Sequence, residues 1–367
     1  MARMRVGILF GGRSGEHEVS IASARSVLAA LDRSKYDVIS IGITHDGEWL
    51  LVEGPEGLAE GKGSRVGVVP GASDRPLVRI DPGSETGRWL TDALDVVFPV
   101  LHGTYGEDGT VQGLLELLGL PYVGPGVMAS AVGMDKVAMK TAFHQAGLPL
   151  APHHVLLVPT WREDAATVMR VVEETLGYPM FVKPSNLGSS VGVSKVEHRT
   201  DLPHAIEAAF RYDRKVLVER GLDCRELECG VLGNDRPEAS VVAEIIPKRA
   251  WYDYQAKYEP GMSEVRIPAP LPPTLAEAVR AQAIRAYRAI DCAGMARVDF
   301  FLERATQTLY VNEINTIPGF TATSVYPKLW EASGVMYPDL LDRLIRLALE
   351  RHRERSRLLT THQRVDR

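Results

Sequence analysis

Side chains of the kind that hold a divalent cation occur in a predicted β-hairpin near the C-terminal end of the chain. Its sequence is MARVDFFLERATQTLYVNEINTIPG, in which two β-strand patterns flank the turn-like ERATQT. If the hairpin folds about Thr306, Asp299 lies opposite Glu313. Arg297 then lies opposite Asn315. Because side chains alternate between the two faces of a strand, all four point to one face.

Two directly opposed carboxylates repel and raise each other's pKa values unless a cation lies between them. Carboxylate and amide oxygens are what Mg²⁺ takes, especially beside phosphate, so Asp299, Glu313 and Asn315 predict a magnesium site. The alternative is a surface hairpin with solvated charges, and a register slip of one residue would remove the site. The opposite face is expected to be core, with Val298, Phe300, Leu302, Tyr310 and Ile314.

A second stretch, FVKPSNLGSSVGVSKV at residues 181–196, carries the residue types that bind phosphate. Lys183 ends a short apolar run, and the GSSVG loop turns directly into the next strand, which predicts a hairpin flap whose backbone N–H groups cover an anion. It is not a P-loop, since the chain has no GxxxxGK[ST] sequence. The alternative is an ordinary Gly/Ser turn. Lys136, in MDK, begins a predicted helix and is either a second phosphate contact or solvated.

Two loops follow predicted strands of an N-terminal sheet, and ligands bind at the carboxyl edge of such sheets. The first, LFGGRSGEHEVS, is not a dinucleotide fingerprint, because Phe10 occupies the place of the first glycine. Glu16 in this loop is either a partner for a cationic amine or a carboxylate that interacts with a helix N-terminus. The second loop, LHGTYGEDG, contains His102 and Glu107, and His102 is either a structural histidine or a ligand contact.

Strand and helix patterns alternate through the first part of the chain and predict a parallel α/β domain. We expect strands at residues 5–10, 38–43 and 93–101, helices at 19–31 and 110–118, and mostly irregular structure with some strand at 54–82. The sequence LPYVGPG marks a boundary near residue 125. The predicted domains are residues 1–125 (α/β), 126–218 (α+β) and 219–350 (with the hairpin), followed by a polar tail at 351–367.

Composition narrows the class of protein. The chain has 367 residues and a net charge of −5, which implies no strong field for nucleic acid. No apolar run is long enough to span a membrane, and the first strand begins too early to leave room for a signal peptide. Three cysteines, Cys224, Cys229 and Cys292, fit reduced thiols better than a disulfide framework. We therefore expect a cytoplasmic protein with neither a nucleic-acid nor a membrane partner.

Seven stretches of the chain together resemble the D-alanine–D-alanine ligases, a family with the ATP-grasp fold. Their order and spacing match over about residues 4–350, which is far more specific than a single glycine pattern. The resemblance implies an α/β fold with a three-domain ATP-grasp architecture, in which an N-terminal parallel α/β domain is followed by two ATP-grasp domains that hold ATP between them. The stretches are GGRSGEHEVS, HGTYGEDGTVQGLLE, MDK, VKPSNLGSSVG, YDYQAKY, ARVDFFL and NEINTIPGFTATS.

The resemblance also implies ATP and two Mg²⁺ ions as cofactors, with Mn²⁺ as a substitute ion. Asp299, Glu313 and Asn315 match the magnesium ligands, which agrees with the hairpin register. The implied nucleotide contacts are Lys136, Lys183 and Lys257 for the phosphates, Ser190 in the flap, and Glu219 and Glu226 for the adenine and ribose.

The implied reaction passes the γ-phosphoryl group of ATP to the carboxylate of one D-alanine, and the amine of a second D-alanine then displaces phosphate. Arg297 and the backbone N–H of Gly319 resemble the site that stabilises the tetrahedral intermediate. Glu16 would hold the ammonium group of the first D-alanine, with His102 beside that substrate. Ser324 and Val325 would line the carboxylate end of the second substrate.

A lid is expected because the acyl phosphate must be kept from water. The sequence WYDYQAKYEPGMSEV resembles that lid, and Ser189 and Tyr258 resemble partners that hydrogen-bond with Glu16 across the site. Tyrosine at this position favours an amine as second nucleophile, so D-alanine is favoured over D-lactate. A ligase for D-lactate or D-serine, and a nucleotide-binding protein without activity, remain alternatives. The resemblance suggests a homodimer acting on D-alanine and ATP.

The lid assignment predicts a change in nucleophile choice. Replacing Tyr258 with phenylalanine should lower the selectivity for an amine over a hydroxyl nucleophile, because a hydrogen bond of the closed lid is lost. The ratio of D-alanyl-D-alanine to D-alanyl-D-lactate formed in a mixture of both nucleophiles measures this. An unchanged ratio would contradict the assignment.

Overall fold

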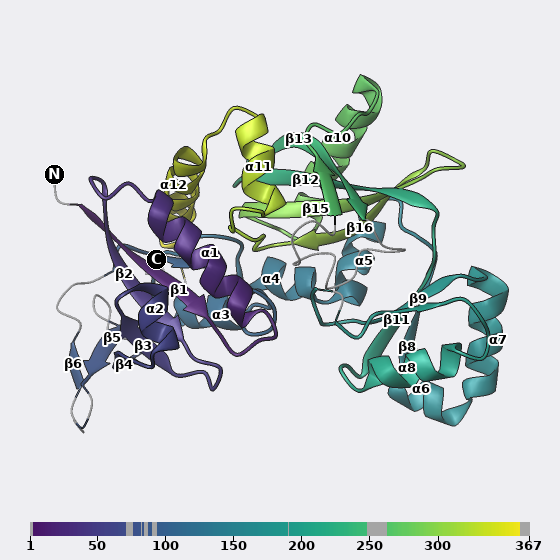
Figure 1. Ribbon diagram of the computed structural model, residues 1–367, viewed down its shortest axis with the longest axis horizontal. Helices are drawn as coiled ribbons and strands as arrows, with labels where there is room; N and C mark the ends of the chain where they lie inside the picture. Colours follow the sequence, from purple (N-terminus) through teal and green to yellow (C-terminus); the bar gives the residue numbers. More distant parts are fainter. Residues whose placement is uncertain are drawn as a thin grey trace, which may run out of the picture.

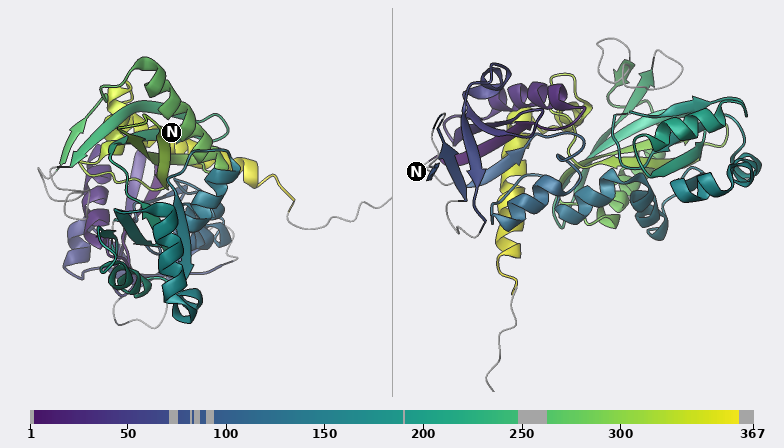
Figure 2. Two further views of the ribbon diagram at one scale, coloured as in Figure 1. Left: turned by 90° about the vertical axis from the view of Figure 1, so that its right-hand side faces the viewer. Right: turned by 90° about the horizontal axis from the view of Figure 1, so that it is seen from below.

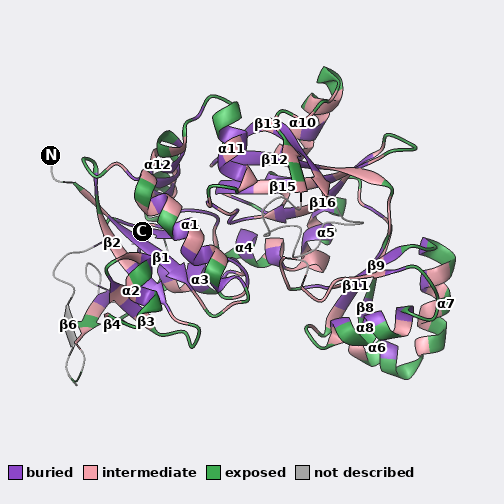
Figure 3. Ribbon diagram, in the orientation of Figure 1, coloured by how far each residue is buried: buried purple, intermediate pink, exposed green. Residues whose placement is uncertain are grey.

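The computed structural model describes residues 3–70, 76–81, 83, 87–89, 94–189, 191–247 and 263–359, which are built around three β-sheets (Figure 1). Helices cover the sheets, and their outward faces are exposed while the sheets are largely buried (Figure 3). In this part of the chain no helix has the length and apolar character needed to cross a membrane.

The first sheet has seven strands in the order β6-β5-β4-β3-β2-β1-β7. Strand β1 is parallel to both β2 and β7, and the pairs from β2 to β6 are antiparallel. The predicted parallel strands are therefore confirmed. The antiparallel strands β3 to β6 extend this sheet through the region that was expected to be mostly irregular. The strands are β1 (Met4–Gly11), β2 (Tyr36–Ile43), β3 (Trp49–Val52), β4 (Ser64–Val68), β5 (Leu77–Ile80), β6 (Gly87–Trp89) and β7 (Val96–Pro99).

Helices from both ends of the chain pack on the first sheet. The N-terminal ones are α1 (His17–Ala30), α2 (Gly54–Ala59) and α3 (Thr110–Leu117). The last helix, α12 (Tyr337–Arg355), returns to α1 and β7 and also contacts the third sheet (Figure 2). Its buried residues Leu344 and Ile345 share a core with Ile8 and Phe98 of the first sheet. The apolar stripe of α12 is thus covered by a sheet that is more than 200 residues away in sequence.

The second sheet has four antiparallel strands in the order β10-β9-β11-β8. Strands β9 and β10 form the predicted hairpin, with Ser194 opposite Val182, so the flap sequence connects two neighbouring strands. The elements are β8 (His153–Leu157), α6 (Val158–Glu163), α7 (Ala165–Leu176), β9 (Met180–Pro184), β10 (Ser194–Val196), α8 (Leu202–Phe210) and β11 (Lys215–Arg220).

The third sheet has five antiparallel strands in the order β14-β13-β12-β15-β16. Its apolar face packs against α4, α5 and α10, so the helix pair after residue 126 shares a core with this sheet. The domain boundaries stay predictions. The elements are α4 (Val127–Met134), α5 (Lys136–Gln145), β12 (Cys224–Gly233), β13 (Glu238–Pro247), β14 (Ser263–Arg266), α10 (Pro273–Ala289), β15 (Gly294–Glu303), β16 (Leu309–Asn315) and α11 (Val325–Ala332).

The register of the β15–β16 hairpin is confirmed where the site was predicted: Asp299 lies opposite Glu313, and Arg297 lies opposite Asn315. Beyond this point Phe300 pairs with Val311, which leaves Asn312 as an extra residue in a β-bulge. The other predicted core positions of the hairpin are buried.

The bulge overturns one core prediction. An extra residue reverses the alternation of the side chains, so Leu309 and Val311 are buried and Tyr310 is only half-buried. Tyr310 was predicted to be core because an uninterrupted period of two was assumed for the whole strand.

The docking of α12 predicts a large effect of a core truncation. Leu344→Ala removes a fully buried side chain from the core shared with the first sheet and should lower the free energy of unfolding by about 2–5 kcal/mol. Urea unfolding measures the loss. Leu358→Ala, at a side chain that is 69% exposed, is the matched control and should change it by less than about 0.5 kcal/mol. Equal effects of the two changes would mean that α12 is not docked as described.

Candidate active site

Two adjoining cavities contain the predicted site residues. The first cavity, of about 770 Å³, lies among the loop before α1, the flap and the loop after β16, and is lined by Glu16, His102, Lys136, Ser189, Arg297, Glu313, Asn315, Gly319, Ser324 and Val325. The second cavity, of about 720 Å³, is lined by strands of the second and third sheets and includes Lys136, Lys183, Ser189, Glu219, Glu226, Asp299 and Glu313. Lys136, Ser189 and Glu313 line both, so the cavities meet at these side chains.

The structure therefore brings together every predicted site residue that it describes. Ser190, Lys257 and Tyr258 lie outside the described residues, as does most of the predicted lid. The roles assigned to the residues stay proposals.

The polar face of the third sheet carries the predicted cation ligands. Arg297 donates two hydrogen bonds to Asp299, from Nε to Oδ1 at 2.7 Å and from Nη2 to Oδ2 at 2.6 Å. The guanidinium also lies 3.1 Å from Oε2 of Glu228, which pairs with Asp299 in the register of β12 and β15. Glu313 completes a row of carboxylates across three neighbouring strands. Such an oxygen-rich donor set suits a hard divalent cation.

Glu228 was missed by the sequence reasoning. It is buried, lines both cavities and extends the acidic row by one strand. The available signal was the alternation in β12, because Glu226 and Glu228 are two residues apart on one strand and so share a face.

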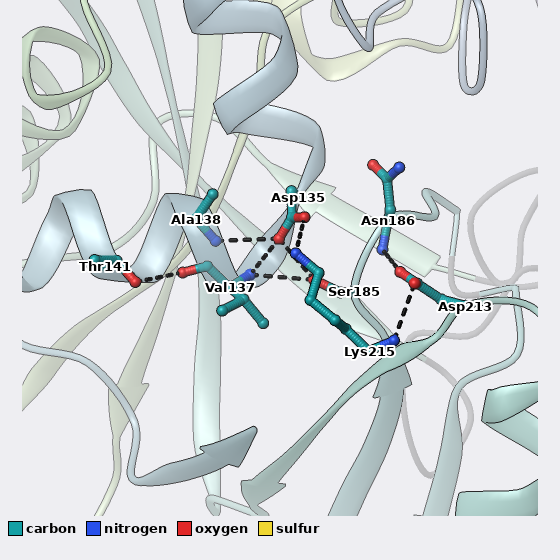
Figure 4. Close-up of polar contacts among 8 residues, drawn as sticks. All are labelled: Asp135, Val137, Ala138, Thr141, Ser185, Asn186, Asp213 and Lys215. Carbon is teal, nitrogen blue, oxygen red and sulfur yellow. Dashed lines mark hydrogen bonds and ion pairs between the residues drawn. The ribbon is translucent and has the colours of Figure 1, made fainter. Parts of the chain in front are cut away.

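The N-terminus of α5 is tied to the base of the flap (Figure 4). Asp135 is the N-cap residue, and its Oδ1 accepts hydrogen bonds from the backbone N–H groups of Val137 and Ala138 at 3.0 and 3.1 Å. The Ser185 hydroxyl donates to the same oxygen at 2.7 Å. Lys215 on β11 pairs with the other carboxylate oxygen. One carboxylate thus joins α5, the flap and the second sheet.

This arrangement fixes Lys136, the first residue of α5. Its backbone N–H donates to the carbonyl oxygen of Ser185 at 2.9 Å. Its Nζ donates to the carbonyl oxygen of Leu187 in the flap at 2.5 Å. The ammonium group is therefore held where the two cavities meet, beside the flap that the sequence predicted to cover phosphate.

The flap also contacts the N-terminal loop. The hydroxyl of Ser189 donates to Oε1 of Glu16, which confirms that these two side chains meet across the site. Ser189 has a φ of +50°, a left-handed conformation that a residue with a side chain adopts at some energetic cost. Glu16 is also the N-cap residue of α1, although its side chain makes no cap hydrogen bond, so the alternative of a carboxylate that interacts with the helix N-terminus stays open.

His102 is held by two hydrogen bonds. Because the carbonyl oxygen of Ile317 can only accept, Nδ1 carries the proton of the bond at 3.1 Å. Nε2 then accepts from the hydroxyl of Ser23 at 3.0 Å. Burial lowers the pKa of His102, which favours the neutral ring. The ring lines the first cavity and at the same time positions the loop after β16.

Glu107 was noted beside His102 in the LHGTYGEDG loop, but no role was assigned to it from the sequence. It is buried in the wall of the first cavity, and its Oε1 accepts a hydrogen bond from the backbone N–H of Gly103 at 2.8 Å. Burial, together with the nearby Glu16 carboxylate, raises the pKa of Glu107 to about 8. The protonated form of Glu107 is therefore favoured at neutral pH. The signal available in the sequence was only its place in the LHGTYGEDG loop.

The far end of the first cavity is formed by the start of α11. Ser324 is the N-cap residue and Val325 the first residue of this helix. The Ser324 Oγ accepts a hydrogen bond from the backbone N–H of Thr321 at 3.0 Å, which shapes the loop after Gly319. A helix N-terminus favours an anion, so this end suits a carboxylate.

Two sheets that face each other across a cavity, with a hairpin flap on one and acidic ligands on the other, form the arrangement of the ATP-grasp ligases. The family model "D-ala D-ala ligase N-terminus" matches residues 5–125, and the model "D-ala D-ala ligase C-terminus" matches residues 142–346. The chain belongs to the D-alanine–D-alanine ligase family and is an ATP-dependent enzyme of the ligase class.

Curated relatives and solved structures agree with this membership. The D-alanine–D-alanine ligase of Thermoanaerobacter sp. (strain X514) is 53% identical, over 97% of this chain and 99% of the relative. That of Geobacillus thermodenitrificans is 47% identical, over 99% of this chain and all of the relative.

The structure of the Coxiella burnetii D-alanine-D-alanine ligase has a TM-score of 0.84 at 39% identity and covers 97% of this chain and 96% of that one. The VanG D-Ala:D-Ser ligase of Enterococcus faecalis has a TM-score of 0.83 at 35% identity and covers 95% of this chain and 100% of that one.

The raised pKa of Glu107 predicts a pH-dependent stability. The folded protein keeps this proton up to a pH of about 8, whereas the unfolded carboxyl loses it near 4.5, so the folded state binds more protons between these values. The free energy of unfolding should therefore fall as pH rises through this window, by up to about 1.4 kcal/mol per unit.

Glu107→Gln cannot titrate, and its stability relative to the unchanged protein should rise across the same window. Thermal unfolding midpoints between pH 5 and 8 measure the difference. Glu60→Gln, at an exposed position, is the control and should follow the unchanged protein. Parallel pH curves for Glu107→Gln and the unchanged protein would contradict the prediction.

Proposed function

We propose that this protein joins two D-alanines to D-alanyl-D-alanine through a D-alanyl phosphate, with ATP as phosphoryl donor, as a step in the synthesis of peptidoglycan precursors. The observation that carries the proposal is the meeting of the two cavities at Lys136, Ser189 and Glu313. A phosphoryl group held there lies between a nucleotide in the second cavity and a carboxylate in the first. The names of the relatives at 53% and 47% identity support D-alanine as the substrate.

In the first step a carboxylate oxygen of the first D-alanine attacks the γ-phosphorus, the bond to the β-phosphate bridging oxygen breaks, and ADP is formed. Glu16, at the edge of the first cavity, holds the ammonium group of this D-alanine. Lys136 and Lys183 offset the negative charge of the phosphates. Ser189 keeps the flap over the reacting groups through its bond to Glu16 and excludes water from them.

Asp299, Glu313 and Asn315 would hold Mg²⁺, with Glu228 as a neighbouring carboxylate. Bound there, the ion supplies neutralisation of charge on the transferring phosphoryl group. Two Mg²⁺ ions would bind at the site, and Mn²⁺ could replace them. The family resemblance and the row of carboxylates support this number.

In the second step the amine of the second D-alanine attacks the carbonyl carbon of the acyl phosphate, the C–O bond to the phosphate breaks, and the phosphate leaves with the proton that the amine loses. Arg297 and the backbone N–H of Gly319 stabilise the oxyanion of the tetrahedral intermediate, since both line the first cavity beside Glu313. The carboxylate of the second D-alanine lies at the N-terminus of α11, at Ser324 and Val325. His102 lies beside the first D-alanine and holds the loop that carries Gly319 through its hydrogen bond to Ile317.

The proposal includes a cytoplasmic homodimer, which the family resemblance supports. A lid that carries Lys257 and Tyr258 would close over the site, and Ser190 would contact the nucleotide. The sequence motifs support both assignments.

Product analysis tests the function. The purified protein is incubated with ATP, Mg²⁺ and D-alanine, alone and with D-serine or D-lactate, and the products are identified by mass spectrometry. We expect D-alanyl-D-alanine with equal amounts of ADP and phosphate. Turnover of ATP that does not depend on D-alanine would refute the proposal, and a preference for D-serine or D-lactate would assign a different second substrate.

The cation ligands predict the loss of activity without loss of the fold. Asp299→Ala and Glu313→Ala should each lower the Mg²⁺-dependent rate by at least about a hundredfold, as removal of a group that stabilises transition-state charge does. Circular dichroism and the thermal midpoint show whether the fold survives. Normal activity in both variants would mean that the carboxylate row does not bind the catalytic cation.

A further inference from the structure

Glu219 on β11 lies between two lysine side chains at the wall of the second cavity. Its Oε2 pairs with Lys183, and its Oε1 lies 2.6 Å from Nζ of Lys140 on α5. The side chains of Lys140 and Glu219 are only 2% and 3% exposed. Burial alone would raise the pKa of Glu219, but Lys140 and Lys183 hold it well below its usual value, so the group is ionised.

Lys140 has a second partner on β16 of the third sheet. Its Nζ donates to the carbonyl oxygen of Asn312 at 3.3 Å. Asn312 is the bulged residue of β16 and directly precedes Glu313, one of the proposed cation ligands. Glu219 and Asn312 both line the second cavity, whereas Lys140 lies behind them. One ammonium group therefore connects β11 of the second sheet with β16 of the third.

The charges show what this contact achieves. Lys183 and Glu219 together are neutral, and Glu313 and Glu226 add negative charge close to Lys183, whose pKa is raised by these carboxylates although burial lowers it. Without Lys140, the Lys183–Glu219 pair would present no net positive charge to a triphosphate. With Lys140, the group of three carries one positive charge in a region shielded from water, where charges interact strongly.

We propose that Lys140 is a positioning residue for nucleotide binding, which neutralises Glu219 from behind the second cavity and thereby leaves the charge of Lys183 available to the phosphates of ATP. The inference rests on the proposed function in that the ligand of the second cavity is ATP. The bond to Asn312 adds a geometric effect, since it holds the bulge from which Glu313 projects.

A double-mutant cycle on nucleotide affinity tests the proposal. Isothermal calorimetry with Mg²⁺ and a non-hydrolysable ATP analogue, without D-alanine, is applied to Lys140→Met, Glu219→Gln and the double variant. Lys140→Met alone should weaken binding by about tenfold or more, as loss of one partner of a buried charge pair does. In the Glu219→Gln background the same change should weaken binding by less than about threefold, because no buried carboxylate is left unbalanced.

Steady-state kinetics supply a second readout. The KM for ATP of Lys140→Met should rise by about the same factor as the dissociation constant, while the KM for D-alanine at the first site should stay within about twofold. Lys35→Met, which removes a lysine paired with Asp342 at a distance of 2.5 Å on the surface, is the matched control and should change neither constant. Thermal midpoints show any general loss of stability.

Equal weakening by Lys140→Met in both backgrounds, or unchanged affinity with only a lower thermal midpoint, would overturn the proposal and leave Lys140 a structural residue. These outcomes are separate from failure of the proposed function. If the unchanged protein binds the nucleotide but forms no D-alanyl-D-alanine, the function is wrong while the role of Lys140 is still decided by the binding data.

Discussion

The site is built around like charges held close together on one face of a sheet. Glu228, Asp299 and Glu313 lie side by side on three neighbouring strands, where Glu228 is buried and the other two are half-buried. Such a row is unfavourable unless cationic groups or a metal offset it. Arg297 binds two of the three carboxylates, and the lysines of α5 and β9 surround the rest of the cavity. The elements that carry these cations are arranged so that the cationic side chains lie near the row of carboxylates.

Each of the three sheets supplies what the others lack. The first sheet contributes the loops with Glu16 and His102, the second contributes Lys183 and the flap, and the third contributes the carboxylate row. Helix α5 connects the second and third sheets, because its first turn is tied to the flap by Asp135 while its apolar side packs on the third sheet. A single helix can therefore position cations against both cavities.

The sequence predicted those parts of the site that depend on local periodicity. The alternation of side chains in β15 and β16 was enough to place Asp299 opposite Glu313, and the apolar runs around GSSVG were enough to predict the flap. The bulge at Asn312 was not predictable, because one added residue leaves the hydrophobic pattern looking regular, and Tyr310 was misplaced for this reason. Glu107 and Lys140 owe their properties to burial by distant segments, which no local pattern reveals.

The return of α12 to the first sheet has a consequence for how the protein is made. Residues of α12 complete the core that surrounds Ile8 and Phe98, yet they are synthesised more than 200 residues after those of β7. The N-terminal segment is therefore synthesised long before its own apolar face can be fully covered. In contrast with chains whose domains mature one after another, the first sheet of this protein reaches its final packing only after α12 has been translated.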